Sequence, residues 1–422
     1  MRVLMISWEY PPHLEGGLGR HVAELVPALT QQDIELHVVT PTSEPPQPGQ
    51  ELKQSPDGFL PDLLVPGATV SVEDGVVVHR VFAPRDDTLF DIYVQAIRVN
   101  HTLEAYVQQI SQQYGPWDLI HIHDWLTGFA GIALQKAIDC PLVATVHATE
   151  RGRFRGHLDN HVQWSINDAE RELVNRADRV IVCSHHMLYE LQDFFGVTAA
   201  QVDIIPNGVD VSELNRNGRH ENLGEFRARY AAPYEKLVFT VSRLVYEKGV
   251  HCLIEAAPRI LSNCPSTQIV VAGRGPQAEA LKQKAEDLGV AQHVNFVGFI
   301  SDEERNLLFK VADCAVFPSL YEPFGIVALE AMALGCPVVV SEVGGFAEMV
   351  IHAETGITTY PGNFESVAWG VSHALTHPDL ARKYAVKARR SVTELFNWTR
   401  IAGLTKGVYG KVLKVRQNYE SI

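Results

Sequence analysis

The sequence has 422 residues, of which 46% are hydrophobic, enough to build two hydrophobic cores of about 200 residues each. Its formal net charge of −14 excludes a general nucleic-acid-binding protein, because such proteins need a basic face to neutralise phosphates. The six cysteines are scattered without CxxC spacing, which argues against a zinc knuckle or a disulfide framework and favours a reducing compartment. No apolar run approaches the roughly 18 residues that span a bilayer, and the opening residues lack a signal-peptide pattern, so we predict a cytoplasmic protein without a transmembrane segment.

The first half of the chain alternates short apolar runs with helical patterns. A helix with one apolar face is expected from about His21. The apolar runs that predict strands are residues 2–7, 36–41, 118–124, 141–147 and 179–184. This alternation is typical of a parallel sheet covered by helices, and it predicts a first α/β unit at residues 1–210. We interpret the Pro- and Gln-rich stretch at residues 43–66 as an insertion within that unit.

A domain boundary is predicted near residue 210. Pro206-Asn207-Gly208 supplies turn chemistry, and the polar segment that follows, residues 211–230, has no strand signal. The alternation then restarts, with strands predicted at residues 236–243, 266–273, 293–299, 313–319 and 336–342. Residues 211–395 are therefore expected to form a second doubly wound unit.

Ligands of open α/β sheets bind beyond the carboxyl ends of the strands, so the loops that follow the strands are the candidate sites. In the first half, Gly16 and Gly17 precede a helix, where backbone N–H groups can face an anion, although the spacing is neither GxGxxG nor a Walker loop. His147 ends one strand, and Asp124, after another, is a possible orienting partner. A histidine in such a place is more often a structural residue, so the assignment depends on its context.

The motif HIHDW at residues 121–125 resembles part of a metal-hydrolase box. The second Asp-His pair of such a box is missing, and Trp125 occupies the next position. We therefore predict no metal site.

Two cations stand after the first predicted strand of the second half. Arg243 and Lys248 lie five residues apart, just before a helix expected near Val250, and cations beside free helix N–H groups suit a diphosphate. The alternative is a solvated charged loop. Gly273, in the stretch AGRGP, marks either a close approach of backbone to a ligand or a tight turn.

Two carboxylates flank the start of another predicted helix. Glu322 falls in the loop before it, and Glu330 falls on its first or second turn. Carboxylates accept hydrogen bonds from vicinal hydroxyls, and the exposed N–H groups at the helix start, those of Phe324, Gly325 and Ile326, suit an anion or a hydroxyl. The alternative is that Glu322 caps the helix and Glu330 is a surface acid. Together with the two cations, the pair favours a nucleotide sugar as the ligand.

The motifs RLVYEKG, AGRGP, VGFIS and EPFGIVALEAMALGCPVVVSEVGG resemble the donor half of retaining GT-B glycosyltransferases of family 4, which include sucrose-phosphate synthases, and of the related glycogen synthases. The resemblance implies an α/β fold of the GT-B type, in which two doubly wound Rossmann-like domains face a central cleft. It implies an acceptor-side domain at residues 1–210, a nucleotide-sugar donor domain at residues 211–395, and a C-terminal helix at about 396–422 that packs back on the first domain.

The resemblance also implies roles for individual residues. Arg243 and Lys248 hold the donor diphosphate, while Glu322 and the backbone at residues 324–326 hold the transferred sugar. Glu330 holds the ribose, and His147 orients the sugar. The remaining donor contacts fall on Gly16, Gly17 and Gly273, with the base near Phe299 and Ile300. Glu15 stands where bacterial glycogen synthases carry a lysine.

The implied reaction is hexosyl transfer with retention, without a metal or another cofactor and with a nucleotide sugar such as UDP- or ADP-glucose as co-substrate. The acceptor contacts are expected from Asp124 and from a basic loop of Arg151, Arg153 and Arg155. Three arginines suit a phosphorylated sugar such as fructose 6-phosphate, which favours a sucrose-phosphate synthase-like enzyme. Two alternatives remain open: glucosyl transfer to an α-glucan, with the arginines paired to nearby acids, and a non-catalytic nucleotide-sugar-binding protein or epimerase.

Overall fold

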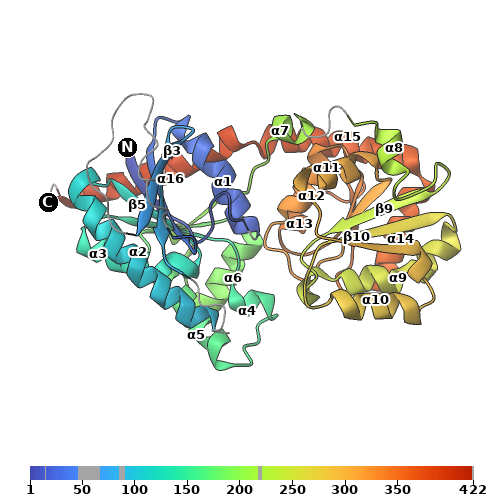
Figure 1. Ribbon diagram of the computed structural model, residues 1–422, viewed down its shortest axis with the longest axis horizontal. Coiled ribbons are helices and arrows are strands. Elements are labelled where there is room, and N and C mark those ends of the chain that lie inside the picture. Colours follow the sequence, from blue (N-terminus) through green and yellow to red (C-terminus); the bar gives the residue numbers. More distant parts are fainter. Residues whose placement is uncertain (15, 46–66, 85–90, 217–220, 421–422) are drawn as a thin grey trace. The chain divides into compact units, whose positions relative to one another are not determined.

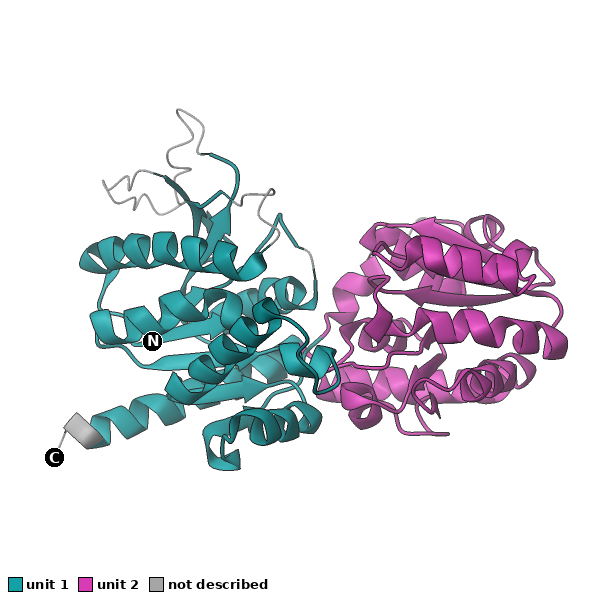
Figure 2. Ribbon diagram, turned by 90° about the horizontal axis from the view of Figure 1, so that it is seen from below, with its two compact units in different colours: residues 1–208, 398–422 teal, residues 209–397 magenta. Residues whose placement is uncertain are grey.

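The computed structural model describes residues 1–14, 16–45, 67–84, 91–216 and 221–420. The chain forms two compact units (Figure 2): unit 1 is Met1–Gly208 with Trp398–Ile422, and unit 2 is Val209–Asn397. Glu15 and most of the predicted insertion, residues 46–66, lie outside the described residues. Within the described ranges, no helix combines the length and the apolar character that a bilayer crossing requires.

Unit 1 is built on a sheet of eight strands in the order β3-β4-β2-β1-β5-β6-β7-β8. All neighbouring strands are parallel except β3 and β4. The central strands are buried along both faces, as parallel strands between helices must be. The strands are β1 (Arg2–Ile6), β2 (Glu35–Thr42), β3 (Ala68–Glu73), β4 (Val76–Phe82), β5 (Leu119–His123), β6 (Leu142–Val146), β7 (Arg179–Val182) and β8 (Val202–Ile204).

The helices of unit 1 lie between these strands in the sequence (Figure 1). They are α1 (Gly17–Thr30), α2 (Ile92–Tyr114), α3 (Gly128–Ala137), α4 (Glu150–Arg153), α5 (His161–Arg176) and α6 (His185–Phe195). The first of them begins at Gly17, earlier than the expected start near His21, because the helix already forms within the glycine-containing loop.

The hairpin of β3 and β4 was not among the predicted strands. Its two-residue turn consists of Asp74 and Gly75, whose φ angles are 49° and 81°. An Asp-Gly pair between two β-rich runs is a strong signal for such a turn, because both central residues need positive φ. The sequence therefore contained the information for this edge of the sheet.

Unit 2 is built on six parallel strands in the order β11-β10-β9-β12-β13-β14. The two sheets, with helices between their strands, confirm the predicted doubly wound α/β architecture of both units. The strands are β9 (Lys236–Val241), β10 (Thr267–Ala272), β11 (Val294–Gly298), β12 (Cys314–Phe317), β13 (Val338–Ser341) and β14 (Ile357–Thr359). The last of these, only three residues long, was not predicted.

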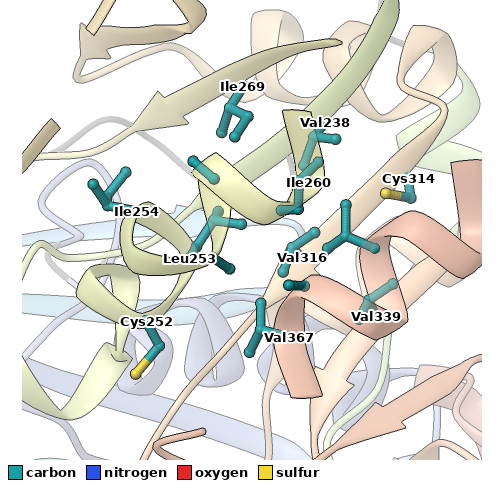
Figure 3. Packing of buried hydrophobic residues seen from close by; sticks show 14 of the residues in the cluster. Val238, Cys252, Leu253, Ile254, Ile260, Ile269, Cys314, Val316, Val339 and Val367 are labelled. Atoms are coloured by element: carbon teal, nitrogen blue, oxygen red, sulfur yellow. The ribbon is translucent and has the colours of Figure 1, made fainter. Parts of the chain in front are cut away.

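The helices of unit 2 pack around this sheet. Leu253 and Ile260 of α9 belong to one buried cluster with Val238 of β9, Val316 of β12 and Val367 of α14 (Figure 3). The helices are α7 (Val211–Arg216), α8 (Leu223–Arg227), α9 (Val250–Asn263), α10 (Ala278–Asp287), α11 (Asp302–Val311), α12 (Ile326–Ala333), α13 (Gly344–Met349), α14 (Phe364–Thr376) and α15 (Pro378–Leu395).

The last helix, α16 (Trp398–Glu420), belongs to unit 1 although it follows unit 2 in the chain. Ile401 and Tyr409 lie in the same buried cluster as Val22 and Leu25 of α1. The Tyr409 hydroxyl is 2.6 Å from Nδ1 of His121, so the helix also reaches a polar group of the central sheet. The chain therefore passes from unit 1 to unit 2 and back.

Candidate active site

The candidate site of unit 2 lies at the point where the strand order reverses. Strand β9 is the first of this unit, and it pairs with β10 on one side and with β12 on the other. The chain leaves β9 toward β10 and leaves β12 toward β13, in opposite directions. In open α/β sheets, ligands bind beyond the strand ends at such a point, which here lies between the loops that follow β9 and β12. The first loop carries Arg243 and Lys248, and the second carries Glu322.

Those two loops are joined by backbone and side-chain bonds. The Lys248 ammonium donates to Glu322 Oε2 at 2.8 Å, and both side chains are largely buried. The Ser319 hydroxyl donates to the same oxygen at 3.1 Å. The backbone N–H of Leu320 donates to the carbonyl of Glu247 at 2.7 Å, which fixes one loop against the other. Lys248 and Glu322, which are 74 residues apart in the sequence, thus form one charged pair.

Glu322 does not cap the following helix. The N-cap residue of α12 is Gly325, and the cap makes no side-chain hydrogen bond. Gly325 has φ 99°, and a Cβ atom there would lie 2.1 Å from the Phe346 ring, so no other residue fits. The backbone of Phe324, Gly325 and Ile326 therefore leads into the helix start with its N–H groups uncapped by a side chain.

Glu330 lies on the second turn of α12 and is buried. The Arg305 guanidinium of α11 lies 3.2 Å from Glu330 Oε1, and it is itself 7% exposed. Arg305 also lies 2.9 Å from Asp302. The interpretation of Glu330 as a surface acid is therefore excluded, and a buried arginine that the sequence did not single out holds its carboxylate in place.

The other predicted donor residues follow β9, β10 and β11. The Arg243 side chain is 59% exposed and lies 3.7 Å from Glu247. Gly273 has φ 128°, and a Cβ atom there would lie 1.8 Å from the Ser242 carbonyl oxygen, so the backbone of these two loops approaches very closely. Phe299 is 70% exposed, with the Arg274 guanidinium 5.5 Å from its ring centre, and Ile300 is half-buried beside it.

In unit 1, the loops after β1, β5 and β6 carry the predicted residues. Gly16 is the N-cap of α1, and its N–H donates to Glu9 Oε2 at 3.1 Å. Gly17 is the first residue of the helix. A carboxylate of the same chain therefore takes the amide of Gly16, which the sequence assigned to a phosphate.

His147 follows β6 and is half-buried. Its Nε2 lies 3.1 Å from Nδ1 of His123, and the two rings are stacked. Burial lowers the pKa of His147 to about 3, so the imidazole is neutral at physiological pH.

Asp124 orients His147 through the backbone. Its Oδ1 accepts a hydrogen bond from the His147 N–H at 2.7 Å, which fixes the loop and not the ring. Burial raises the pKa of Asp124 to about 6, partly opposed by the hydrogen bond from His147 and by Arg153. The side chain is almost fully buried, which leaves little of its surface for an acceptor.

The arginines of the basic loop have different surroundings. Arg151 lies over two aromatic rings, 5.2 Å from the centre of Phe194 and 5.9 Å from that of Trp164. Arg153 lies 3.6 Å from the Glu150 carboxylate. Arg155 is exposed and has φ 55°. Arg151 and Arg153 thus contact other side chains of the protein, and the loop is not a uniform cluster of cations facing solvent.

Several residues of these sites were missed by the sequence reasoning. Ser319, Arg305 and Arg274 contact the predicted residues of unit 2. In unit 1, His21 lies beside His147 and contacts Asn207. For Arg305 the sequence offered only a weak signal. It is a charged residue on the same helix as the buried Leu307 and Leu308. Nothing in the local sequence pointed to the others.

Both halves of the chain match known families. Residues 15–213 match the model described as Glycosyltransferase Family 4, and residues 225–391 match that described as Glycosyl transferases group 1. A glycogen synthase of Mycobacterium tuberculosis is 35% identical over 415 residues, which cover 97% of this chain and 94% of that protein.

Two further relatives also match along their whole length. The alpha-maltose-1-phosphate synthase of Mycolicibacterium smegmatis is 30% identical over 431 residues, covering 98% of this chain and 100% of that protein. The solved structure of a sucrose-phosphate synthase from Thermosynechococcus elongatus superposes with a TM-score of 0.78 at 26% identity, covering 98% of this chain and 99% of that one.

Proposed function

Because this chain belongs to the glycosyltransferases of group 1 and family 4, and is a glycosyltransferase with the GT-B fold, we propose that it transfers a glucosyl group from UDP- or ADP-glucose with retention at the anomeric carbon. The favoured acceptor is an α-glucan. A sugar phosphate, as in a sucrose-phosphate synthase-like reaction, is the second candidate.

The observation that carries this proposal is the buried pair of Lys248 and Glu322 at the switch point of unit 2, with Arg243 on the same loop. In our proposal, Arg243 and Lys248 bind the diphosphate and stabilise the negative charge that develops on it. Glu322 accepts hydrogen bonds from hydroxyls of the transferred sugar. Glu330, held by Arg305, does the same for the ribose, and the exposed Phe299 ring lies beside the base.

The proposed step needs no nucleophile from the protein. The bond between the anomeric carbon and the phosphate oxygen breaks, and the acceptor hydroxyl oxygen bonds to the same carbon from the same face. Its proton passes to the departing phosphate oxygen. Fixed cations help most where the leaving group gains charge, so the two basic side chains take the place of a metal ion, and no cofactor is needed. His147 contributes a neutral imidazole to the sugar.

The basic loop favours the glucan as the acceptor. Arg151 is packed on aromatic rings and Arg153 lies beside a carboxylate, so both guanidinium groups already have partners within the protein, unlike those of a simple anion receptor. The glycogen synthase relative agrees with this choice. The sugar-phosphate candidate is supported by the exposed Arg155 and by two relatives whose names include a phosphorylated product, the sucrose-phosphate and alpha-maltose-1-phosphate synthases.

Acceptor-dependent release of nucleotide tests the proposal. The purified protein is incubated with UDP-glucose, ADP-glucose or GDP-mannose, each with glycogen, fructose 6-phosphate, glucose 1-phosphate or no acceptor, with and without EDTA. We expect release from a glucose donor that glycogen stimulates and EDTA does not change, with a new α-linkage visible by NMR. Stimulation by a sugar phosphate alone supports the second candidate. Binding of nucleotide without release under any condition indicates the non-catalytic alternative.

A further inference from the structure

Three histidines from separate elements of unit 1 lie close together in space. His21 comes from α1, His123 from the end of β5, and His147 from the loop after β6. One ring nitrogen of each lies within 4.8 Å of one ring nitrogen of each of the others. The His21 and His147 ring centres are 4.7 Å apart, and those of His123 and His147 are 5.3 Å apart.

Two of these rings have a buried nitrogen without a hydrogen-bond partner. Within the described part of the chain, Nε2 of His21 and Nε2 of His123 are buried and have no hydrogen-bond partner. The two residues are 4% and 0% exposed. A buried polar atom without a partner is costly, because it has lost its bonds to water and gained none from protein. The cluster therefore has ring nitrogens whose hydrogen-bonding potential the protein itself does not satisfy.

The contacts of His21 define which nitrogen has a lone pair. Its Nδ1 lies 2.7 Å from the side-chain oxygen of Asn207, which can only accept, so Nδ1 carries the proton. Nε2 is then unprotonated. Metal-bound histidines commonly donate their second ring N–H to an oxygen acceptor in this way, which fixes the orientation of the ring.

The neighbouring histidine of the same strand is not available. His121 has its Nδ1 2.6 Å from the Tyr409 hydroxyl and its Nε2 2.8 Å from the Thr145 hydroxyl. Only one of the two histidines of the HIHDW motif thus joins the cluster. The group that forms in space differs from the metal-hydrolase box considered from the sequence.

We propose that His21, His123 and His147 form a binding site for a single divalent transition-metal ion, with zinc as the best fit. Imidazole nitrogens suit this class of ion, and three of them leave one tetrahedral position for water or substrate. His123 Nδ1 and His147 Nε2, which are 3.1 Å apart, lie slightly closer than the separation of about 3.4 Å that two nitrogens adopt on tetrahedral zinc, given Zn–N bonds of about 2.1 Å. A metal ion would replace the hydrogen bond between these two nitrogens, and His21 would ligate through its unpartnered Nε2. His147, half-buried, provides the accessible side of the site.

The consequence of binding is inhibition, because the metal ligates the imidazole that the proposed reaction uses on the sugar. This part rests on the proposed function, whereas the binding itself does not.

Metal titration of the EDTA-stripped full-length protein tests the proposal. We expect one Zn²⁺ per chain by competition with a chromophoric chelator, and tetrahedral d–d absorption bands with Co²⁺. His21→Gln removes a ligand and should weaken zinc binding at least about 100-fold, and Asn207→Ala removes the bond that orients His21 and should weaken it about 10- to 100-fold. His101→Gln, an exposed histidine on α2, is the matched control and should bind as wild type.

The outcomes separate the two proposals. Absence of zinc binding by the wild type, or equal binding by all four proteins, overturns the metal site whatever the enzymatic result. If the site exists, micromolar zinc should inhibit acceptor-dependent nucleotide release, EDTA should restore it, and Asn207→Ala should resist zinc more than wild type. Circular dichroism checks that each variant is folded, and Asn207→Ala keeps the test informative if His21→Gln does not fold.

Discussion

The two units keep polar groups in their interiors in different ways. Unit 1 buries neutral histidines, His21, His37, His79, His121 and His123, which contact one another and nearby tyrosine, threonine and asparagine side chains. Among the described residues of unit 2, no histidine is buried. The buried polar residues there include Arg305 and Glu330, which pair with each other, and Glu322, which pairs with the largely buried Lys248. Buried or largely buried pairs of a cation with a carboxylate thus lie in the unit proposed to bind the diphosphate. The unit proposed to bind the acceptor buries a cluster of uncharged imidazole rings, together with the acids Asp124, Glu150, Glu170 and Glu190.

This difference predicts that acid destabilises unit 1 first. Burial lowers the pKa of His37 to about 4 and those of His79 and His121 to about 3, compared with about 6.5 in an unfolded chain. Between pH 6.5 and the pKa of each buried histidine, the unfolded state binds more protons than the folded state. The stability that depends on the neutral rings is therefore fully present above pH 6.5 and is lost as the pH falls below it. In this range each such histidine costs about 1.4 kcal/mol of stability per pH unit. Asp124 and Glu170 oppose this loss, because burial raises the pKa of Asp124 to about 6 and that of Glu170 well above its usual value, but the five buried histidines of unit 1 outweigh these two carboxyls.

Urea unfolding of the full chain at pH 7.5 and pH 5 measures this effect. Five of the six tryptophans lie in unit 1, so a Trp369→Phe variant reports on that unit alone by fluorescence. Hydrogen exchange read by mass spectrometry follows both units in the same sample. We expect unit 1 to lose several kcal/mol and unit 2 to change little; an equal loss in both units would contradict the comparison.

Breaking the charged pair of unit 2 should have the next largest effect. Lys248→Ala removes a proposed phosphate-binding cation and leaves the Glu322 carboxylate buried without its cationic partner, so kcat should fall about 10²- to 10³-fold and Tm should also fall. The matched control is Arg259→Ala, which breaks the exposed pair of Arg259 and Glu365 and should change stability by less than about 1 kcal/mol. Similar effects of the two substitutions would show that burial of the pair has no special role.

The smallest expected effect comes from removing the Glu330 carboxylate, which pairs with Arg305 in unit 2. Glu330→Ala should weaken UDP or ADP binding by about 1–3 kcal/mol, because hydrogen bonds to the ribose are lost and Arg305 is left without one of its carboxylate partners. Isothermal titration calorimetry measures the affinity, with the exposed Glu365→Ala as control. Wild-type affinity in the Glu330 variant would contradict the ribose assignment.

Much of the fold followed from local patterns. The buried strands of both units and the helix at residues 326–333 were predicted from apolar runs and turn residues, because a segment that must bury one or both faces shows it in its own sequence. The β3–β4 hairpin was missed although its Asp-Gly turn was visible, and β14 was missed because it is only three residues long. Assigning sites to the loops after strands also needed only the sequence, since parallel strands gather those loops at one edge of their sheet.

The sequence by itself determined which residue types stand at the ends of which strands, including Arg243, Lys248, Glu322 and His147. Only the tertiary structure decided their partners: Lys248 with Glu322, Arg305 with Glu330, and Arg151 with aromatic rings instead of an anion. The same holds for His21, which α1 brings to the other two histidines. The physical reason is that periodicity and turn chemistry act between near neighbours in the chain. Contacts between loops depend instead on the order in which the strands assemble, and no local pattern encodes that order.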